Sequence, residues 1–185
     1  MKRIIMTLIV LLVASVVMVM AQTDERTLTC KERKAVQARM DSIQHDEAVR
    51  ALRDTAFTLQ AGQVVFKRGY RAYVSSSTNF VSVAGGRATV QVSFNIPVSG
   101  PNGMGGITVE GMIGDYKTRT DKKGVVYTSF TVLGSAISAQ LFITLYPGQS
   151  EASVEISPNF NSRRLTLEGE ILPADKSFVV QGRAL

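Results

Sequence analysis

The distribution of apolar and polar residues divides the chain into three parts. Residues 4–21 carry no charge and are largely apolar. Residues 30–54 are rich in Glu, Lys, Arg, Gln and Ala, which favour a helix. From Phe57 onward apolar and polar residues alternate, which is the period of a strand with one buried face and one wet face. The pattern predicts an apolar leader, one helix and a sheet.

The alternation is clearest in residues 87–95, where the apolar side chains of Val90, Val92 and Phe94 share one face. Thr89, Gln91 and Ser93 alternate with them and are expected to face solvent. Later segments repeat the pattern through Ile107, Val109 and Ile113, through Ile137, Ala139, Leu141, Ile143 and Leu145, through Val154 and Ile156, and through Leu165, Leu167 and Ile171.

Short turns rich in Gly, Pro, Asn and Asp separate these segments, and glycine supplies the positive φ angles that tight hairpins require. They are Ala84-Gly85-Gly86, Pro101-Asn102-Gly103, Asp121-Lys122-Lys123-Gly124, Pro147-Gly148 and Ser157-Pro158-Asn159. Parallel strands would need long crossover connections, and no helical stretch separates the segments. We therefore predict a mainly β fold, an antiparallel meander of about eight or nine strands.

One apolar face can be hidden in either a sandwich or a barrel, and the pattern leaves both open. Glycines within or beside the strands indicate bends and favour the more curved, barrel-like sheet. They are Gly106, Gly111, Gly114, Gly134 and Gly169.

The predicted helix begins at a capping box, because Thr29 and Glu32 have the spacing at which each side chain satisfies a backbone donor. Its apolar stripe changes face along its length, from Val36, Met40 and Ile43 to Val49, Leu52 and Ala56. Either the helix bends near residues 44–46, or its first half projects from the body. We expect the second half to dock on the sheet, over one opening or one flank.

Residues 1–21 have the features of a secretory signal peptide. Lys2 and Arg3 form a positive start, and Val19 and Ala21 occupy the small-residue positions before a cleavage site. A polar leader, 22–29, would follow it. A retained membrane anchor is the alternative, since 18 uncharged residues reach the lower limit of a membrane span. Either outcome exports the β domain, 55–185, to the periplasm or the outer membrane.

Charge and cysteine content narrow the range of partners. Lys2 and Arg3 would be removed with the signal peptide. The mature chain would then have 19 of the 21 basic residues and all 15 acidic ones, a net charge of +4. The basic residues are scattered, which argues against nucleic-acid binding. A weak peripheral attraction to anionic polymers or lipid headgroups stays open. Cys30 is the only cysteine and cannot form an intrachain disulfide, so it is either inert or an interchain contact.

Several residues invite a chemical role, and each has a simpler explanation. His45 is the only histidine and adjoins Asp46 and Glu47, but a metal site would need further ligands at fixed spacing. A lone histidine on a charged helix face is expected to be solvated. The segment 100–106 resembles a phosphate loop without the following Lys-Ser or Lys-Thr, and it enters a strand. We interpret it as a hairpin connection. Lys67, Arg68 and Arg71 are expected to form a solvated strand edge.

An enzyme would need titratable groups that converge in one pocket. Asp115, Tyr116, Tyr127 and Glu110 are candidates, but nothing in the sequence brings them together. No serine lies in a Gly-x-Ser-x-Gly elbow. We therefore expect no enzyme activity, no catalytic, cofactor-binding or metal site, and no cofactor.

Five motifs between Phe57 and Pro173 carry a family resemblance. They are Phe-Lys-Arg-Gly at 66–69, Asn-Phe-Val at 79–81, Gly-Pro-Asn-Gly with Gly-Gly-Ile-Thr-Val-Glu-Gly within 100–111, Ser-Pro-Asn-Phe-Asn-Ser at 157–162 and Leu-Thr-Leu-Glu-Gly at 165–169. With them the chain resembles the Domain of Unknown Function 4251 family, exported proteins of Gram-negative envelopes. The resemblance implies export, a single domain and a helix before the sheet, and it brings no assigned activity or catalytic residue.

Two functions follow as expectations. The first is a non-catalytic binding or structural β domain for an unknown partner in the envelope, which would have a filled core. The alternative is a carrier of a hydrophobic or amphiphilic ligand in a barrel-like cavity. A cavity of several hundred Å³ would favour the carrier, because pockets for small molecules have that size.

Overall fold

The computed structural model describes residues 29–94, 106–135, 137–159 and 164–184. The predicted signal at 1–21, most of the predicted leader and residues 100–105 of the glycine-rich segment lie outside these ranges. Contacts divide the chain into two units, Met1–Ala38 and Arg39–Leu185, and each is considered by itself. No helix among the described residues has the length and apolar character needed to cross a membrane.

The predicted helix is α2, Cys30–Arg53, and its predicted capping box is confirmed. The backbone N–H of Thr29 donates to Glu32 Oε2 at 2.8 Å, and the N–H of Glu32 donates to Thr29 Oγ1 at 3.3 Å. The hydrogen bond from the Thr29 backbone, followed by that from its side chain, lowers the pKa of Glu32. The first turn is therefore fixed by local sequence alone.

The helix ends in a left-handed turn that sends the chain into the sheet. Thr55 has a φ of 52°. The N–H of Ala56 donates to the Ala51 carbonyl at 3.1 Å, and the N–H of Thr55 donates to the Leu52 carbonyl at 3.4 Å. This pair of bonds is a Schellman motif, which satisfies helix carbonyls that would otherwise lack a partner.

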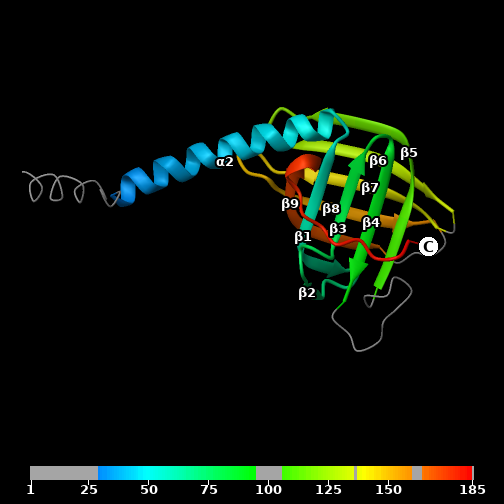
Figure 1. The fold of residues 1–185 in the computed structure, drawn as a ribbon. Helices are drawn as coiled ribbons and strands as arrows, with labels where there is room; N and C mark the ends of the chain where they lie inside the picture. The colour runs from blue at the N-terminus through cyan, green and yellow to red at the C-terminus, as the bar shows by residue number, and fades with distance from the viewer. Residues whose placement is uncertain (1–28, 95–105, 136, 160–163, 185) are drawn as a thin grey trace, which may run out of the picture. The chain divides into compact units, whose positions relative to one another are not determined.

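The described residues after α2 form nine antiparallel strands, and eight of them close a barrel (Figure 1). The barrel forms because β1 pairs with both β3 and β9, so the first and last strands of the meander meet. The short strand β2 pairs with the other end of β1 and lies outside this circuit. The strands are β1 (Phe57–Phe66), β2 (Arg71–Tyr73), β3 (Phe80–Ala84), β4 (Arg87–Ser93), β5 (Gly106–Thr120), β6 (Val126–Gly134), β7 (Ser138–Leu145), β8 (Glu151–Pro158) and β9 (Leu165–Pro173), and a 3₁₀ turn, η1 (Ala174–Lys176), follows.

Closure of the barrel depends on one glycine at the β1–β9 seam. Gly169 pairs with Ala61, next to a bulge between Ala61 and Gln63. A Cβ atom at Gly169 would lie 2.0 Å from the carbonyl oxygen of Gln60 and 2.7 Å from the Ala61 Cα. No side chain fits at that distance, so the close approach of the two strands requires glycine.

The inward faces of the strands are the apolar ones that the alternation predicts. Leu141, Ile143 and Leu145 are fully buried or nearly so. The rings of Phe57 and Phe130 meet edge to face with centroids 6.4 Å apart in the core. These large side chains fill the end of the barrel at which β1 begins.

The second half of α2 closes the filled end. Ala48, Ala51 and Leu52 are buried in the same apolar cluster as the strands, with Val49 packed against it. The predicted docking of this half of the helix is confirmed. Met40 and Ile43 remain about half exposed, at 48% and 47%.

The outer face of β4 differs from the prediction. Gln91 and Ser93 were expected to face solvent, but both are buried, as is Thr108 on β5. They do point away from the barrel core. The chain after η1 crosses the outside of β1, β3 and β4 and covers Gln91 (Figure 1). The Thr108 hydroxyl donates to Gln91, and the Ser93 N–H donates to Asn79 Oδ1. We call residues Ser177–Ala184 the C-terminal strap. Alternation showed the direction of these side chains, but the strap removes the solvent.

The predicted hairpin turns within the described residues are confirmed except the last. Gly85 and Gly86 take positive φ angles of 57° and 78° between β3 and β4. The prediction of a turn at Ser157-Pro158-Asn159 is wrong in its position. Strand β8 continues to Pro158, because Ala139 of β7 still pairs with it there.

Candidate functional site

The end of the barrel opposite α2 contains a cavity of about 370 Å³. Its walls come from the last residues of β1, β4, β6 and β8 and the first residues of β5, β7 and β9. Apart from Gly106 and one arginine, every lining side chain is apolar: Phe66, Val90, Val92, Phe94, Ile107, Val109, Val132, Ile137, Ala139, Ile156, Pro158 and Leu165. We call this the mouth cavity. It has the size and character of a site for a small apolar group.

Large apolar side chains at the rim of the mouth cavity are partly exposed. Phe66 is 38% exposed and Ile107 is 41% exposed, although both belong to the inward-facing set. Phe66 stacks on Phe94 with ring centroids 5.6 Å apart. Apolar surface of this kind gains free energy when a ligand removes it from water, at about 25 cal/mol per Å².

Among the described residues, one charged side chain lines the mouth cavity. Arg164 immediately precedes β9, and its Nη1 lies 3.1 Å from Glu155 Oε1 on β8. Because Glu155 faces outward, this ion pair holds the guanidinium at the rim rather than in the core.

A second, polar groove adjoins the mouth cavity on the outside of the barrel. It measures about 730 Å³ and shares Phe66 and Arg164 with the mouth cavity. We call it the rim groove. Its lining includes Lys67 and the hydroxyl groups of Ser157 and Thr166. Apolar and polar sites therefore lie side by side across one rim.

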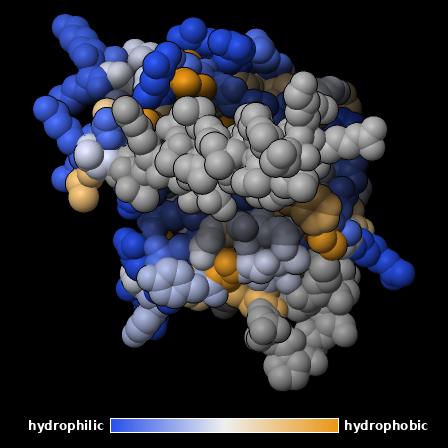
Figure 2. Space-filling view, turned by 60° about the vertical axis from the view of Figure 1, so that its left-hand side comes forward, coloured by the Kyte–Doolittle hydropathy of each residue, from blue (hydrophilic) through white to orange (hydrophobic). Residues whose placement is uncertain are grey.

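Another groove, of about 700 Å³, lies over β1, β8 and β9 and contains Tyr73, Tyr146 and Glu170. Tyr73 is 90% exposed, so its ring remains in contact with water although it lines this groove. Figure 2 shows a face that is mainly hydrophilic, with its hydrophobic residues in small separate groups. The mouth cavity is the concave apolar site among these grooves.

The structure gives His45 a structural role. Its Nδ1 donates to the carbonyl oxygen of Gln149 at 2.9 Å, which ties α2 to the β7–β8 turn. Asp46 is exposed, and Glu47 forms an ion pair with Lys176 at 2.8 Å. The expectation of a merely solvated histidine is therefore incomplete. Among the described residues, no three His, Cys, Asp or Glu side chains come together as metal ligands.

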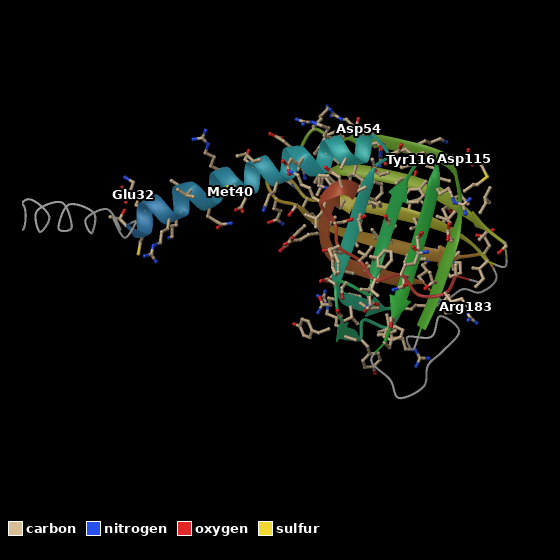
Figure 3. All side chains as sticks on the ribbon, viewed as in Figure 1. Glu32, Met40, Asp54, Asp115, Tyr116 and Arg183 are labelled. Carbon is tan, nitrogen blue, oxygen red and sulfur yellow. The ribbon has the colours of Figure 1, made fainter. Side chains whose placement is uncertain are left out.

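The four residues considered for catalysis point to different parts of the barrel. Tyr116 donates its hydroxyl hydrogen to the Leu52 carbonyl and lies beside the end of α2, where Figure 3 also places Asp54. Asp115 is exposed. Glu110 forms an ion pair with Arg87 at 2.8 Å. Tyr127 lies under the Arg119 guanidinium, 5.0 Å from its ring centroid.

The predicted basic edge is exposed, and one of its members is tied to the barrel. Arg71 on β2 forms an ion pair with Glu168 at 3.2 Å. Lys67 and Arg68 are exposed in the turn before it. Arg71 therefore anchors β2, while Lys67 lines the rim groove.

Sequence reasoning raised a barrel-like cavity as an alternative but did not locate it, and it missed Arg164. Alternation identified Val92, Phe94 and Ile107 as inward-facing but carried no signal for which inward positions lie beyond the filled core. Arg164 directly precedes the apolar alternation of β9, and this position at the start of a strand was the available sequence signal for a charged residue at the end of the barrel. Its role depends on Glu155 of the neighbouring strand, which only the register of β8 and β9 brings close.

The chain is thus a small antiparallel barrel, filled at one end and with an apolar cavity at the other. Residues 39–171 match the model of a family described as a domain of unknown function, DUF4251. A crystal structure of a DUF4251 family protein from Bacteroides eggerthii DSM 20697 is similar, with 50% identity and a TM-score of 0.67. That match covers 76% of this chain and 94% of the other. The chain belongs to the DUF4251 family. Among curated proteins, none matches it.

Proposed function

We propose that this protein is an exported, non-catalytic binding protein of the cell envelope that holds the apolar part of a ligand in the mouth cavity. Of the two functions expected from the sequence, this is the carrier. The observation that carries the proposal is the mouth cavity itself, about 370 Å³ with an almost wholly apolar lining.

The contrast between the two ends of the barrel supports uptake at one end. Phe57 and Phe130 fill the end beneath α2, so an entering group would stop above them. A purely structural domain gains nothing from leaving Phe66 and Ile107 partly exposed at the other end. A bound apolar group would cover both.

Binding without catalysis is supported by the placement of the titratable groups. Among the described residues, Arg164 is the only titratable one that lines the mouth cavity, and an arginine does not exchange protons near neutral pH. General acid–base chemistry needs a group that does. Export is supported by the signal-like residues 1–21.

The proposal is tested by the affinity of the mature protein for straight-chain 1-alkanols, measured by displacement of an environment-sensitive fluorescent probe. Each added methylene should raise the affinity about fourfold, the equivalent of about 0.8 kcal/mol, until the cavity is full. Ile107→Arg should lower the affinity for 1-decanol at least tenfold, because it places a charge among apolar walls.

Met112→Arg is the matched control. Met112 lies on the same strand as Ile107 but faces outward and is 64% exposed. We expect this variant to bind as the wild type does, with both variants melting within a few degrees of it. Affinity that does not depend on chain length, or equal loss in the two variants, would disprove the mouth cavity as the site.

A further inference from the structure

Two adjoining sites share one rim, and their chemistry differs. The mouth cavity takes apolar groups, whereas the rim groove is lined by Lys67, Arg164, Glu155 and two hydroxyl groups. Phe66 and Arg164 belong to both. A ligand that fills both sites must therefore be amphiphilic, with its chain inside the barrel and its polar head outside the rim.

The charge of the rim groove indicates the sign of that head. Among the described lining residues, Lys67 and Arg164 contribute two positive charges and Glu155 contributes one negative charge, a sum of +1. A cationic head would meet two like charges there, whereas an anionic head would compensate the excess. The hydroxyl groups of Ser157 and Thr166 can donate hydrogen bonds to the same head.

The size of the charge favours a carboxylate over a phosphate monoester. A carboxylate carries one negative charge at neutral pH, which balances the charge of +1 on the described lining residues. A phosphate monoester carries about −1.5 to −2 and would leave a negative excess beside Glu155. A guanidinium also offers the planar fork of donors that a carboxylate accepts in a bidentate manner.

From these observations we infer that the ligand is a single-chain carboxylate of the fatty-acid type, with its chain in the mouth cavity and its carboxylate at Arg164. The inference rests on the proposed function and deepens it. Glu155 occupies the guanidinium in the empty protein, and the ligand carboxylate shares or replaces that partner. Arg164 thereby acts as the residue that selects the headgroup.

The test compares four ligands that share one ten-carbon chain: decanoate, 1-decanol, decylammonium and decyl phosphate. Titration calorimetry on the mature protein at pH 7 measures each affinity. We expect decanoate to bind about tenfold more tightly than 1-decanol, the size of one charge-assisted hydrogen bond. Decylammonium should bind more weakly than 1-decanol.

Variants assign the preference to Arg164. Arg164→Gln should lower the affinity for decanoate about tenfold and leave the affinity for 1-decanol within twofold of the wild-type value. Glu155→Gln should strengthen decanoate, because it removes the competing carboxylate. Arg87→Gln is the matched control, since Arg87 forms an equally exposed ion pair with Glu110 outside the rim, and it should change neither affinity.

The outcomes separate this inference from the proposed function. Equal binding of decanoate and 1-decanol to the wild type would overturn the carboxylate and leave the apolar site intact. Tighter binding of decyl phosphate or decylammonium would overturn it in favour of another headgroup. If Arg164→Gln lost affinity for both decanoate and 1-decanol, Arg164 would be a structural part of the cavity wall and not the residue that binds the headgroup. No binding of any chain would refute both proposals.

Discussion

At the scale of single residues, Tyr116 joins the helix to the barrel. Its hydroxyl donates to the Leu52 carbonyl at the end of α2, and its ring stacks on Phe130 with centroids 5.5 Å apart. Burial raises the pKa of Tyr116 above its ordinary value near 10, and hydrogen bonds with Thr118 and Thr128 offset part of that rise. The side chain is therefore held in its neutral form.

Replacing Tyr116 should change stability in a pH-dependent way. Because the pKa is raised in the folded protein, the contribution of Tyr116 is fully present below pH 10 and is lost as the pH rises through the folded value. We expect Tyr116→Phe to lower the free energy of unfolding by about 1 kcal/mol at pH 8. The difference from wild type should shrink as the pH rises above 10.

Urea unfolding at several pH values measures this difference. Tyr73→Phe provides the control, since Tyr73 is 90% exposed and should change the free energy of unfolding little at neutral pH. A gap between wild type and Tyr116→Phe that widens at alkaline pH would contradict the assigned role.

At the scale of elements, the C-terminal strap follows one row of paired residues across the outside of the barrel. Gln60, Phe80, Gln91 and Thr108 are successive partners on β1, β3, β4 and β5. The side chain of Gln60 donates to the Phe178 carbonyl at 2.7 Å, and the strap continues from there to Gln91. The strap therefore lies over the row that contains Gln91, a side chain that alternation alone places in water.

Gln91 holds the strap with all of its hydrogen-bonding capacity. Its Nε2 donates to the carbonyls of Thr78 and Val180 at 2.9 and 2.8 Å. Its Oε1 accepts from the Thr108 hydroxyl at 2.9 Å and from the Gly182 N–H at 2.7 Å. A fully satisfied buried amide of this kind fixes one position of the strap.

Gln91→Ala should therefore release the strap. We expect a loss of about 2 kcal/mol in the free energy of unfolding, since several buried polar groups lose their partner. Hydrogen exchange of the Gly182 amide should accelerate at the same time. Gln140→Ala, an exposed glutamine on β7, should stay within about 0.5 kcal/mol of wild type. Unchanged exchange at Gly182 would show that Gln91 does not hold the strap.

At the scale of the whole molecule, the seam between β1 and β9 turns a meander into a barrel and creates the mouth cavity. The seam runs from Phe57 opposite Pro173 to Phe66 opposite Leu165. Phe66 and Leu165, the last pair of the seam, are also lining residues of the mouth cavity. Closure and the candidate site are thus parts of one feature.

Gly169→Ala should open this seam. The added Cβ would meet backbone atoms at 2.0 and 2.7 Å, so we expect a loss of about 3 kcal/mol in the free energy of unfolding. Gly62→Ala is the matched control, because a Cβ at Gly62 meets nothing within 4 Å. Chemical denaturation of both variants measures the difference. Equal stability of the two would mean that the seam tolerates separation.

The sequence predicted most elements because they depend on local rules. The Thr29–Glu32 capping box, the glycines at 85 and 86, and the inward faces of β4 and β7 all follow from neighbouring residues. The misplaced turn at Ser157-Pro158-Asn159 shows the limit of such rules. Pairing with β7 carried the strand through residues that favour a turn when considered alone.

The amino-acid sequence carries the period of each segment, and it therefore predicts the helix, the approximate number of strands and the side of the sheet that each residue faces. The closure of the sheet, the cover of Gln91 by the strap and the ion pair of Arg164 with Glu155 at the rim arise only when the chain folds. Those outcomes depend on register between segments far apart in the chain. Periodicity records which face is apolar, but it holds no information on how far the core fills the space behind that face.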